Sequence, residues 1–207
     1  MDIKFRKGQD PASPLVVVNC FGNEAEGLMP LLEGEIPDHS LLAVSGLDWD
    51  NDLSPWKAEA VFKGSSGFGG RGGEYLRKLT STILPDVISR EGTDPSAVYI
   101  AGYSLAGLFA LYALYSCDAF DGAASCSGSL WFPGFLDFAK TREFPKKPSR
   151  IYLSLGDKEA KTRNPVMATV EYNTRELFGI YRDMGIDTEF VLNPGNHFKD
   201  PEKRLSD

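Results

Sequence analysis

Short apolar runs alternate with helical patterns along this chain. Six runs of five residues are mostly apolar and are bounded by Gly, Pro and Asp, which is typical of strands covered on both faces. They are residues 15–19, 41–45, 98–102, 122–126, 151–155 and 188–192. The pattern therefore predicts a buried, mainly parallel sheet with helices packed against it.

Three helical patterns lie between these runs. Residues 74–90 carry an apolar stripe at helical spacing, and Pro85 should kink or break that helix. Residues 105–115 are apolar nearly all round, which predicts a buried helix. Residues 164–184 begin with Asn-Pro, an N-cap followed by proline at the first helical position, and a glycine follows their end. Strands alternating with helices predict an α/β fold, a three-layer αβα sandwich.

Two long segments interrupt this alternation. Residues 46–73 and 127–149 are irregular and rich in Gly, Ser, Pro, Trp and Phe, a composition that favours binding loops in a compact domain. Neither segment has the character of a linker, so residues 1–207 are expected to form a single domain.

Composition narrows the classes of partner. The chain has 207 residues and a formal net charge of −7, which argues against nucleic acid and anionic membranes as partners. Its longest strongly apolar stretch is too short to span a bilayer, and its N-terminus is too polar for a signal peptide. Three cysteines without a C-x-x-C pair do not indicate a disulfide framework, and two histidines leave little for a metal site. We expect a soluble, cytoplasmic protein without a metal.

One serine stands where a predicted strand meets a predicted helix. In Gly102-Tyr-Ser104-Leu-Ala106, the residues two before and two after the serine are small. A nucleophile elbow requires this because the strand and helix backbones come close there. The usual pattern has Gly where Ala106 stands. The alternative is that Ser104 only caps the helix.

A serine nucleophile needs a base, which is normally histidine. His39 precedes the strand at 41–45 whereas Ser104 follows its own strand, so a parallel sheet puts them at opposite edges. His39 is therefore expected to be a surface or loop residue. His197 follows the strand at 188–192 and shares the edge of Ser104. The alternative for His197 is a surface loop residue without a role.

A carboxylate should hold the imidazole from the side away from Ser104. The strand at 151–155 ends in Gly-Asp-Lys-Glu, which offers Asp157 nearer to the sheet and Glu159 with the longer reach. The acid that does not face the imidazole is expected to serve a turn or a helix cap.

The oxyanion of an ester intermediate needs two backbone donors. One should be the N–H of Leu105, next to the nucleophile at a helix N-terminus. The other should come from Phe21 or Gly22, in the loop after the strand at 15–19. That loop can also be interpreted as an ordinary strand-to-helix turn.

These motifs resemble those of the α/β-hydrolase superfamily, and more narrowly its esterase branch of enterochelin esterases and S-formylglutathione hydrolases. The resemblance rests on residues 75–85, 102–111, 156–159 and 194–198, and spans about residues 15–198. It implies an α/β-hydrolase fold and hydrolysis of carboxylic or thiol esters by a Ser-acid-His triad without a cofactor. In that branch a Gly-x-x-Asp or Gly-x-x-Glu motif supplies the acid, which favours Glu159. The short chain leaves no room for a separate lid domain and implies an open cleft.

Aromatic residues in the two long segments are candidates for the lining of that cleft. Trp49, Trp56, Trp131 and Phe132 follow predicted strands at the edge of Ser104. They would wall an acyl or aryl pocket for a small-molecule ester, or they would cover the core instead.

The sequence leaves two rival functions open. Residues 67–72 match Gly-x-Gly-x-x-Gly, but a dinucleotide site needs that turn directly after a core strand and at the start of a helix. A nucleotide-binding protein of Rossmann type is the less favoured rival. An acyltransferase or a non-catalytic binding protein would keep the hydrolase fold.

Overall fold

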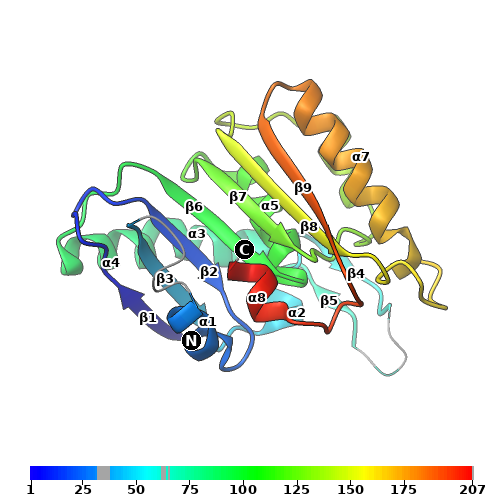
Figure 1. The fold of residues 1–207 in the computed structure, drawn as a ribbon, viewed down its shortest axis with the longest axis horizontal. Coiled ribbons are helices and arrows are strands. Elements are labelled where there is room, and N and C mark those ends of the chain that lie inside the picture. The colour runs from blue at the N-terminus through cyan, green and yellow to red at the C-terminus, as the bar shows by residue number, and fades with distance from the viewer. Residues whose placement is uncertain (32–37, 62–63, 65, 207) are drawn as a thin grey trace.

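The computed structural model describes residues 1–31, 38–61, 64 and 66–206, and in these ranges seven strands form one sheet (Figure 1). The strand order is β1-β3-β2-β6-β7-β8-β9, with β1 (Asp2–Arg6) antiparallel to β3 and all other neighbours parallel. The parallel strands are β2 (Leu15–Asn19), β3 (Ser40–Ser45), β6 (Val98–Tyr103), β7 (Gly122–Cys126), β8 (Arg150–Gly156) and β9 (Asp187–Asn193). All six predicted strands are present, which confirms the predicted fold class.

Helices cover one face of the sheet more fully than the other. Behind the sheet in Figure 1 lie α3 (Gly72–Lys78), α4 (Leu84–Glu91), α5 (Leu105–Ser116) and α7 (Val170–Asp183). Their apolar side chains share one core with the strands. In front lie α1 (Glu24–Leu31) and α8 (Pro201–Ser206), which enclose a smaller cluster. A hollow of about 520 Å³ on this front face is lined by residues such as Tyr99, Tyr152 and Val191, so the third layer is thin.

The helix expected over 74–90 is a helical run from Gly72 to Glu91 with a π-helical turn at Leu79–Ile83. This wider turn comes just before Pro85, near the start of α4. Proline has no N–H to donate and its ring crowds the preceding turn, so a wider turn accommodates it where a regular α-helical turn would break. Pro85 therefore distorts the helix and does not end it.

Asn164 makes the N-cap contacts predicted for the last long helix, but the helical residues begin later than predicted, because Pro165 lies in a turn before them. Asn164 Oδ1 accepts the N–H groups of Val166 and Met167 at 3.0 and 3.3 Å. This cap opens the 3₁₀ turn Met167–Thr169, which leads into α7. Gly185 follows the helix with φ 69°, as expected for a glycine stop.

The two segments expected to be irregular contain more structure than the pattern indicated. The first holds α2 (Trp49–Asp52) and a separate two-stranded sheet of β4 (Lys57–Ala58) and β5 (Phe68–Gly69). The second holds α6 (Phe135–Thr141). Phe135 and Ala139 are buried at a spacing of four residues, so a short apolar stripe stabilises α6 where turn-rich composition had hidden it.

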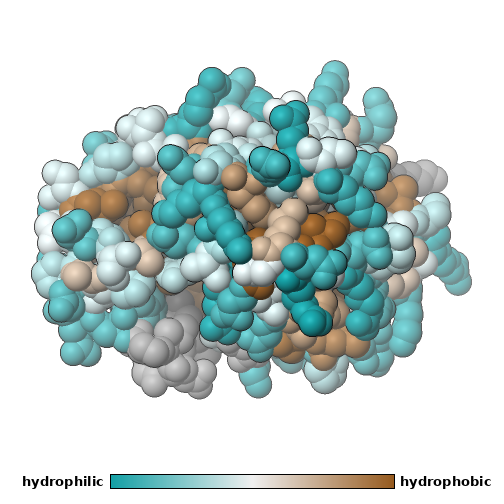
Figure 2. Space-filling view, turned by 90° about the horizontal axis from the view of Figure 1, so that it is seen from above, coloured by the Kyte–Doolittle hydropathy of each residue, from teal (hydrophilic) through white to brown (hydrophobic). Residues whose placement is uncertain are grey.

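Polar side chains cover most of the face seen in Figure 2, and hydrophobic residues appear there in separate patches. Within the part of the chain that the structure describes, no helix is long and apolar enough to cross a membrane.

Candidate active site

Ser104 occupies a sharp turn between β6 and α5. Its backbone has φ 59° and ψ −121°, a strained conformation for a residue other than glycine. A Cβ on Gly102 would lie 2.5 Å from the Cβ of Ala106, so the turn requires glycine at that position. The side chain of Ser104 makes no capping bond to α5, contrary to the capping alternative. The small residues around the serine thus have the steric role that the motif predicts.

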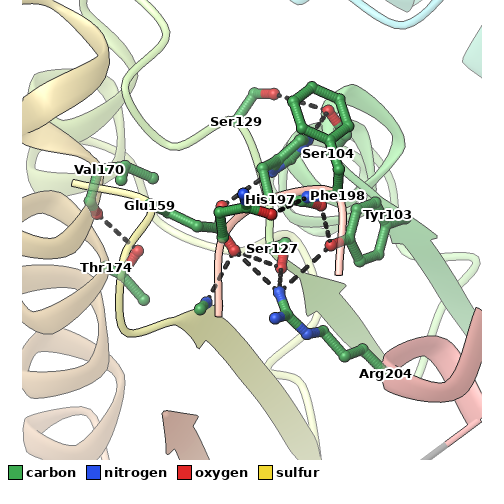
Figure 3. Close-up of polar contacts among 12 residues, drawn as sticks. Tyr103, Ser104, Ser127, Ser129, Glu159, Val170, Thr174, His197, Phe198 and Arg204 are labelled. Carbon is green, nitrogen blue, oxygen red and sulfur yellow. Dashed lines mark hydrogen bonds and ion pairs between the residues drawn. The ribbon is translucent and has the colours of Figure 1, made fainter. Parts of the chain in front are cut away.

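The hydroxyl of Ser104 faces the imidazole of His197, which lies in the loop after β9 (Figure 3). Ser104 Oγ is 3.0 Å from His197 Nε2, and His197 Nδ1 is 2.8 Å from Glu159 Oε2. An ionised carboxylate only accepts hydrogen bonds, so Nδ1 donates to Glu159; when the imidazole is neutral, Nε2 is the acceptor for the serine hydroxyl. The structure therefore brings together a hydroxyl, an imidazole and a carboxylate from three separate loops.

Glu159 is a buried acid, with its side chain only 4% exposed. Its second oxygen, Oε1, accepts the hydroxyl of Ser127 at 2.8 Å and the N–H of Gly156 at 2.7 Å. Burial alone would raise the pKa of Glu159. The hydrogen bond and charge of His197, with the bonds from Ser127 and Gly156, instead hold that pKa below its ordinary value. The carboxylate is therefore charged at neutral pH.

Asp157, the other candidate acid, does not face the imidazole. Its Oδ1 accepts the N–H of Gly195 at 2.7 Å, and its own N–H donates to the carbonyl of Asn193 at 2.8 Å. Asp157 thus fixes the turn that leads to His197, which is the turn role expected for the acid that does not contact the histidine.

Three further contacts around these side chains were also not anticipated from the sequence. The phenol of Tyr103 donates to the carbonyl of His197 at 2.6 Å, and the N–H of Ser129 donates to the carbonyl of Ser104 at 2.9 Å. The third is the guanidinium of Arg204, which reaches Glu159 from α8. Tyr103 lies inside the elbow motif and could have been singled out there. Arg204 lies in a short polar segment with no signal in the sequence.

The backbone N–H groups predicted to hold the oxyanion come from Leu105 and from the loop of Phe21 and Gly22, and they differ in the hydrogen bonds they already make. Leu105 is the first residue of α5, so its N–H belongs to the turn that has no intrahelical partners. The N–H of Phe21 already donates to Glu24 Oε2 at 2.7 Å, which ties it to the first turn of α1. Gly22 is exposed and has φ 52°, a conformation that favours glycine. The loop thus includes the strand-to-helix turn considered as its simpler interpretation.

The predicted pocket aromatics divide into two groups. Phe132 is 1% exposed and packs against Trp56, with ring centroids 5.8 Å apart, and Trp131 is also buried. Trp56 packs against the main core and donates its indole N–H to the carbonyl of Pro133 at 3.0 Å. These three residues pack in or against the main core, as in the core-covering alternative, and a pocket role for them stays a prediction. Trp49 is half-buried and lines, with Phe21 and Gly22, a hollow of about 340 Å³.

Two other sequence features lie away from this site. His39 precedes β3 at the opposite edge of the sheet and contacts Arg6. It is a loop residue, but it is buried rather than on the surface because the chain packs over it there. The glycine-rich stretch 67–72 contains β5 of the small separate sheet and thus does not follow a core strand, so it lacks the context of a dinucleotide site.

Comparisons with known proteins agree with this architecture. A family model described as Putative esterase matches residues 22–197. The chain is also similar to the uncharacterized protein YbbA of Bacillus subtilis (strain 168), with 24% identity over 183 residues, 83% of this chain and 72% of that protein.

Solved structures with the same fold include two hydrolases. The siderophore hydrolase EstB from Aspergillus nidulans has a TM-score of 0.75 and 18% identity, over 99% of this chain and 87% of that one. An IroE-like serine hydrolase from Shewanella oneidensis has a TM-score of 0.76 and 16% identity, over 98% of this chain and 72% of that one. The α/β-hydrolase fold is thereby confirmed. Because the family model spans most of its length, this chain belongs to the Putative esterase family and is a carboxylic ester hydrolase.

Proposed function

We propose that the chain hydrolyses carboxylic esters through an acyl-enzyme on Ser104, with His197 as general base and Glu159 as the orienting acid. The observation that carries this proposal is the continuous hydrogen-bonded path from Ser104 Oγ to His197 Nε2 and from His197 Nδ1 to Glu159 Oε2. Each side chain has the atom that its role requires within hydrogen-bond distance of the next.

In the first half of the reaction Ser104 attacks the ester carbonyl. As the Oγ–C bond forms, the hydroxyl proton passes to His197 Nε2, and Glu159 stabilises the resulting imidazolium. The negative charge on the former carbonyl oxygen is held by the N–H of Leu105 and a second N–H from the Phe21–Gly22 loop. When the bond to the alcohol oxygen breaks, His197 returns the proton to the leaving alkoxide.

In the second half water replaces the alcohol. The water oxygen attacks the acyl carbon while His197 takes a proton from the water. The bond between Ser104 Oγ and the acyl carbon then breaks. His197 gives that proton to Ser104, so the enzyme is restored and the carboxylic acid leaves. No oxidant, metal or cofactor enters this proton and electron balance.

Substrate choice is a separate question from mechanism. EstB is described as a siderophore hydrolase, so siderophore esters belong in a substrate panel beside simple acyl esters and thioesters. Product analysis with and without an added alcohol distinguishes hydrolysis from the rival acyl transfer.

The mechanism is tested with a nitrophenyl ester and a fluorophosphonate label located by mass spectrometry. Ser104→Ala and His197→Ala should each reduce turnover to near background while circular dichroism stays native, and Ser104→Ala should also lose the label. Ser89→Ala, an exposed serine in α4, is the matched control and should behave as the wild type. A near-normal rate in either site variant would exclude this mechanism.

A further inference from the structure

Arg204 is a buried cation that α8 directs toward the proposed active site (Figure 3). Its Nη1 lies 3.1 Å from Glu159 Oε1 and 3.1 Å from Ser127 Oγ. Its Nη2 donates to the carbonyl of Pro194 at 3.1 Å, in the loop that carries His197. One side chain therefore contacts both the acid and the backbone that leads to the imidazole.

The contacts of Glu159 divide cleanly between its two oxygens. Oε1 accepts from Ser127, Gly156 and Arg204, whereas Oε2 faces His197 Nδ1. With Oε1 held from three directions, the carboxylate plane has little freedom to rotate. The position of Oε2 opposite the imidazole thus depends on groups that never touch His197 themselves.

The charge of Arg204 also matters because the pair is buried. A buried carboxylate on its own would strongly favour the protonated imidazolium, which cannot act as a base. A permanent guanidinium charge beside the carboxylate offsets part of that attraction, since arginine does not deprotonate at working pH.

We propose that Arg204 is a positioning residue for ester hydrolysis, which fixes Glu159 against His197 and extends the active pH range toward acid. This inference rests on the proposed serine mechanism. It assigns to α8 a part in the reaction that neither its short length nor its polar sequence indicates.

Other titratable groups face His197 and have to be separated from this effect. Tyr103 at the end of β6 contacts its carbonyl and its ring, and Glu159 contacts its Nδ1. Asp157 acts one contact away through Gly195. None of the three is substituted in the Arg204 variants below, although Tyr103 Oη loses the contact that Arg204 Nη1 makes at 3.4 Å, and Glu159 is replaced only on purpose.

The test compares pH–rate profiles of Arg204→Gln, Arg204→Lys and the control Lys203→Gln on a nitrophenyl ester. Lys203 is exposed in the same helix, so Lys203→Gln removes an equal charge without touching Glu159. Arg204→Gln should lower kcat about tenfold and move the acid limb of kcat/KM upward by about one pH unit. In Arg204→Lys, the acid limb of kcat/KM should return most of the way to its wild-type pH. Lys203→Gln should match the wild type.

A double-mutant cycle covers the case in which Arg204→Gln is simply less stable. In a Glu159→Gln background there is no carboxylate to position, so adding Arg204→Gln should reduce kcat less than twofold further. An unmoved acid limb, or a full tenfold loss in that background, would overturn the role of Arg204. A wild-type protein that neither takes the fluorophosphonate label on Ser104 nor turns over the ester would instead overturn the proposed mechanism, so the two failures are distinguishable.

Discussion

Asp157 and Glu159 stand two residues apart after β8 and hold the loop of His197 by different atoms. Asp157 binds the backbone N–H of Gly195, whereas Glu159 binds the imidazole itself. The shorter side chain of Asp157 reaches the loop backbone, and the longer side chain of Glu159 reaches Nδ1. A single short motif thus supplies both the support of the loop and the acid of the proposed triad.

These two acids should respond differently to removal of their charge. Glu159→Gln should lower kcat by about 10³–10⁴, because an amide can hold the imidazole in the wrong tautomer. Asp157→Asn keeps an oxygen that can accept from Gly195, so it should lower kcat less than about tenfold. Both are measured as initial rates on a nitrophenyl ester. Equal losses in the two variants would contradict the assignment of Glu159.

The low pKa of Glu159 predicts how stability depends on pH. Its folded pKa lies below the ordinary value of 4.5, so its contribution is fully present above that value and is lost as pH falls through the folded pKa. At pH 7 the free energy of unfolding of Glu159→Gln should therefore be about 3 kcal/mol lower than that of the wild type. Urea unfolding at pH 7, 4 and 3 should show this gap narrowing in acid, and a constant gap would contradict the prediction.

The sequence was most informative where one local rule decides the structure. Runs such as 15–19 and 122–126 are buried on both faces, and their composition alone distinguishes them from amphipathic elements. β1 and α8 were not predicted because they lie at an edge and at the chain end. β1 has no buried side chain and α8 buries only Arg204 and Ser206, so neither has a clear apolar periodicity in the sequence.

The candidate site divides in the same way. Ser104 and His197 could be found because a steric motif and strand direction constrain where they lie. Arg204 could not, because its contact with Glu159 joins residues 45 apart and follows no spacing rule. The engagement of Phe21 with Glu24 was predictable in principle, since a glutamate three residues on reaches back to an N–H in a capping box.

Tyr103 should contribute through its hydroxyl. Its phenol donates to the carbonyl of His197 at 2.6 Å, and burial raises its pKa, so it stays a neutral donor. Tyr103→Phe should reduce stability by about 1 kcal/mol and kcat by a few fold with little change in KM. The control is Tyr172→Phe, whose residue is 61% exposed on α7. Identical kinetics in both variants would show that the contact does not orient the histidine.

The close approach at the elbow gives the last prediction. A Cβ on Gly102 would meet the backbone of Ala106 at 2.5 Å, so Gly102→Ala has to push β6 and α5 apart. Overpacking of this kind should lower the free energy of unfolding by about 2 kcal/mol and displace Ser104 enough to lower kcat.

Gly179 in α7 provides the matched control, because a Cβ there would meet nothing within 4 Å. Gly179→Ala should stabilise the protein by about 0.5–1 kcal/mol through helix propensity and leave kcat unchanged. Thermal unfolding and nitrophenyl ester rates of both variants test the pair. If Gly102→Ala proves as stable and as active as Gly179→Ala, the elbow does not need glycine and the steric explanation of the motif is wrong.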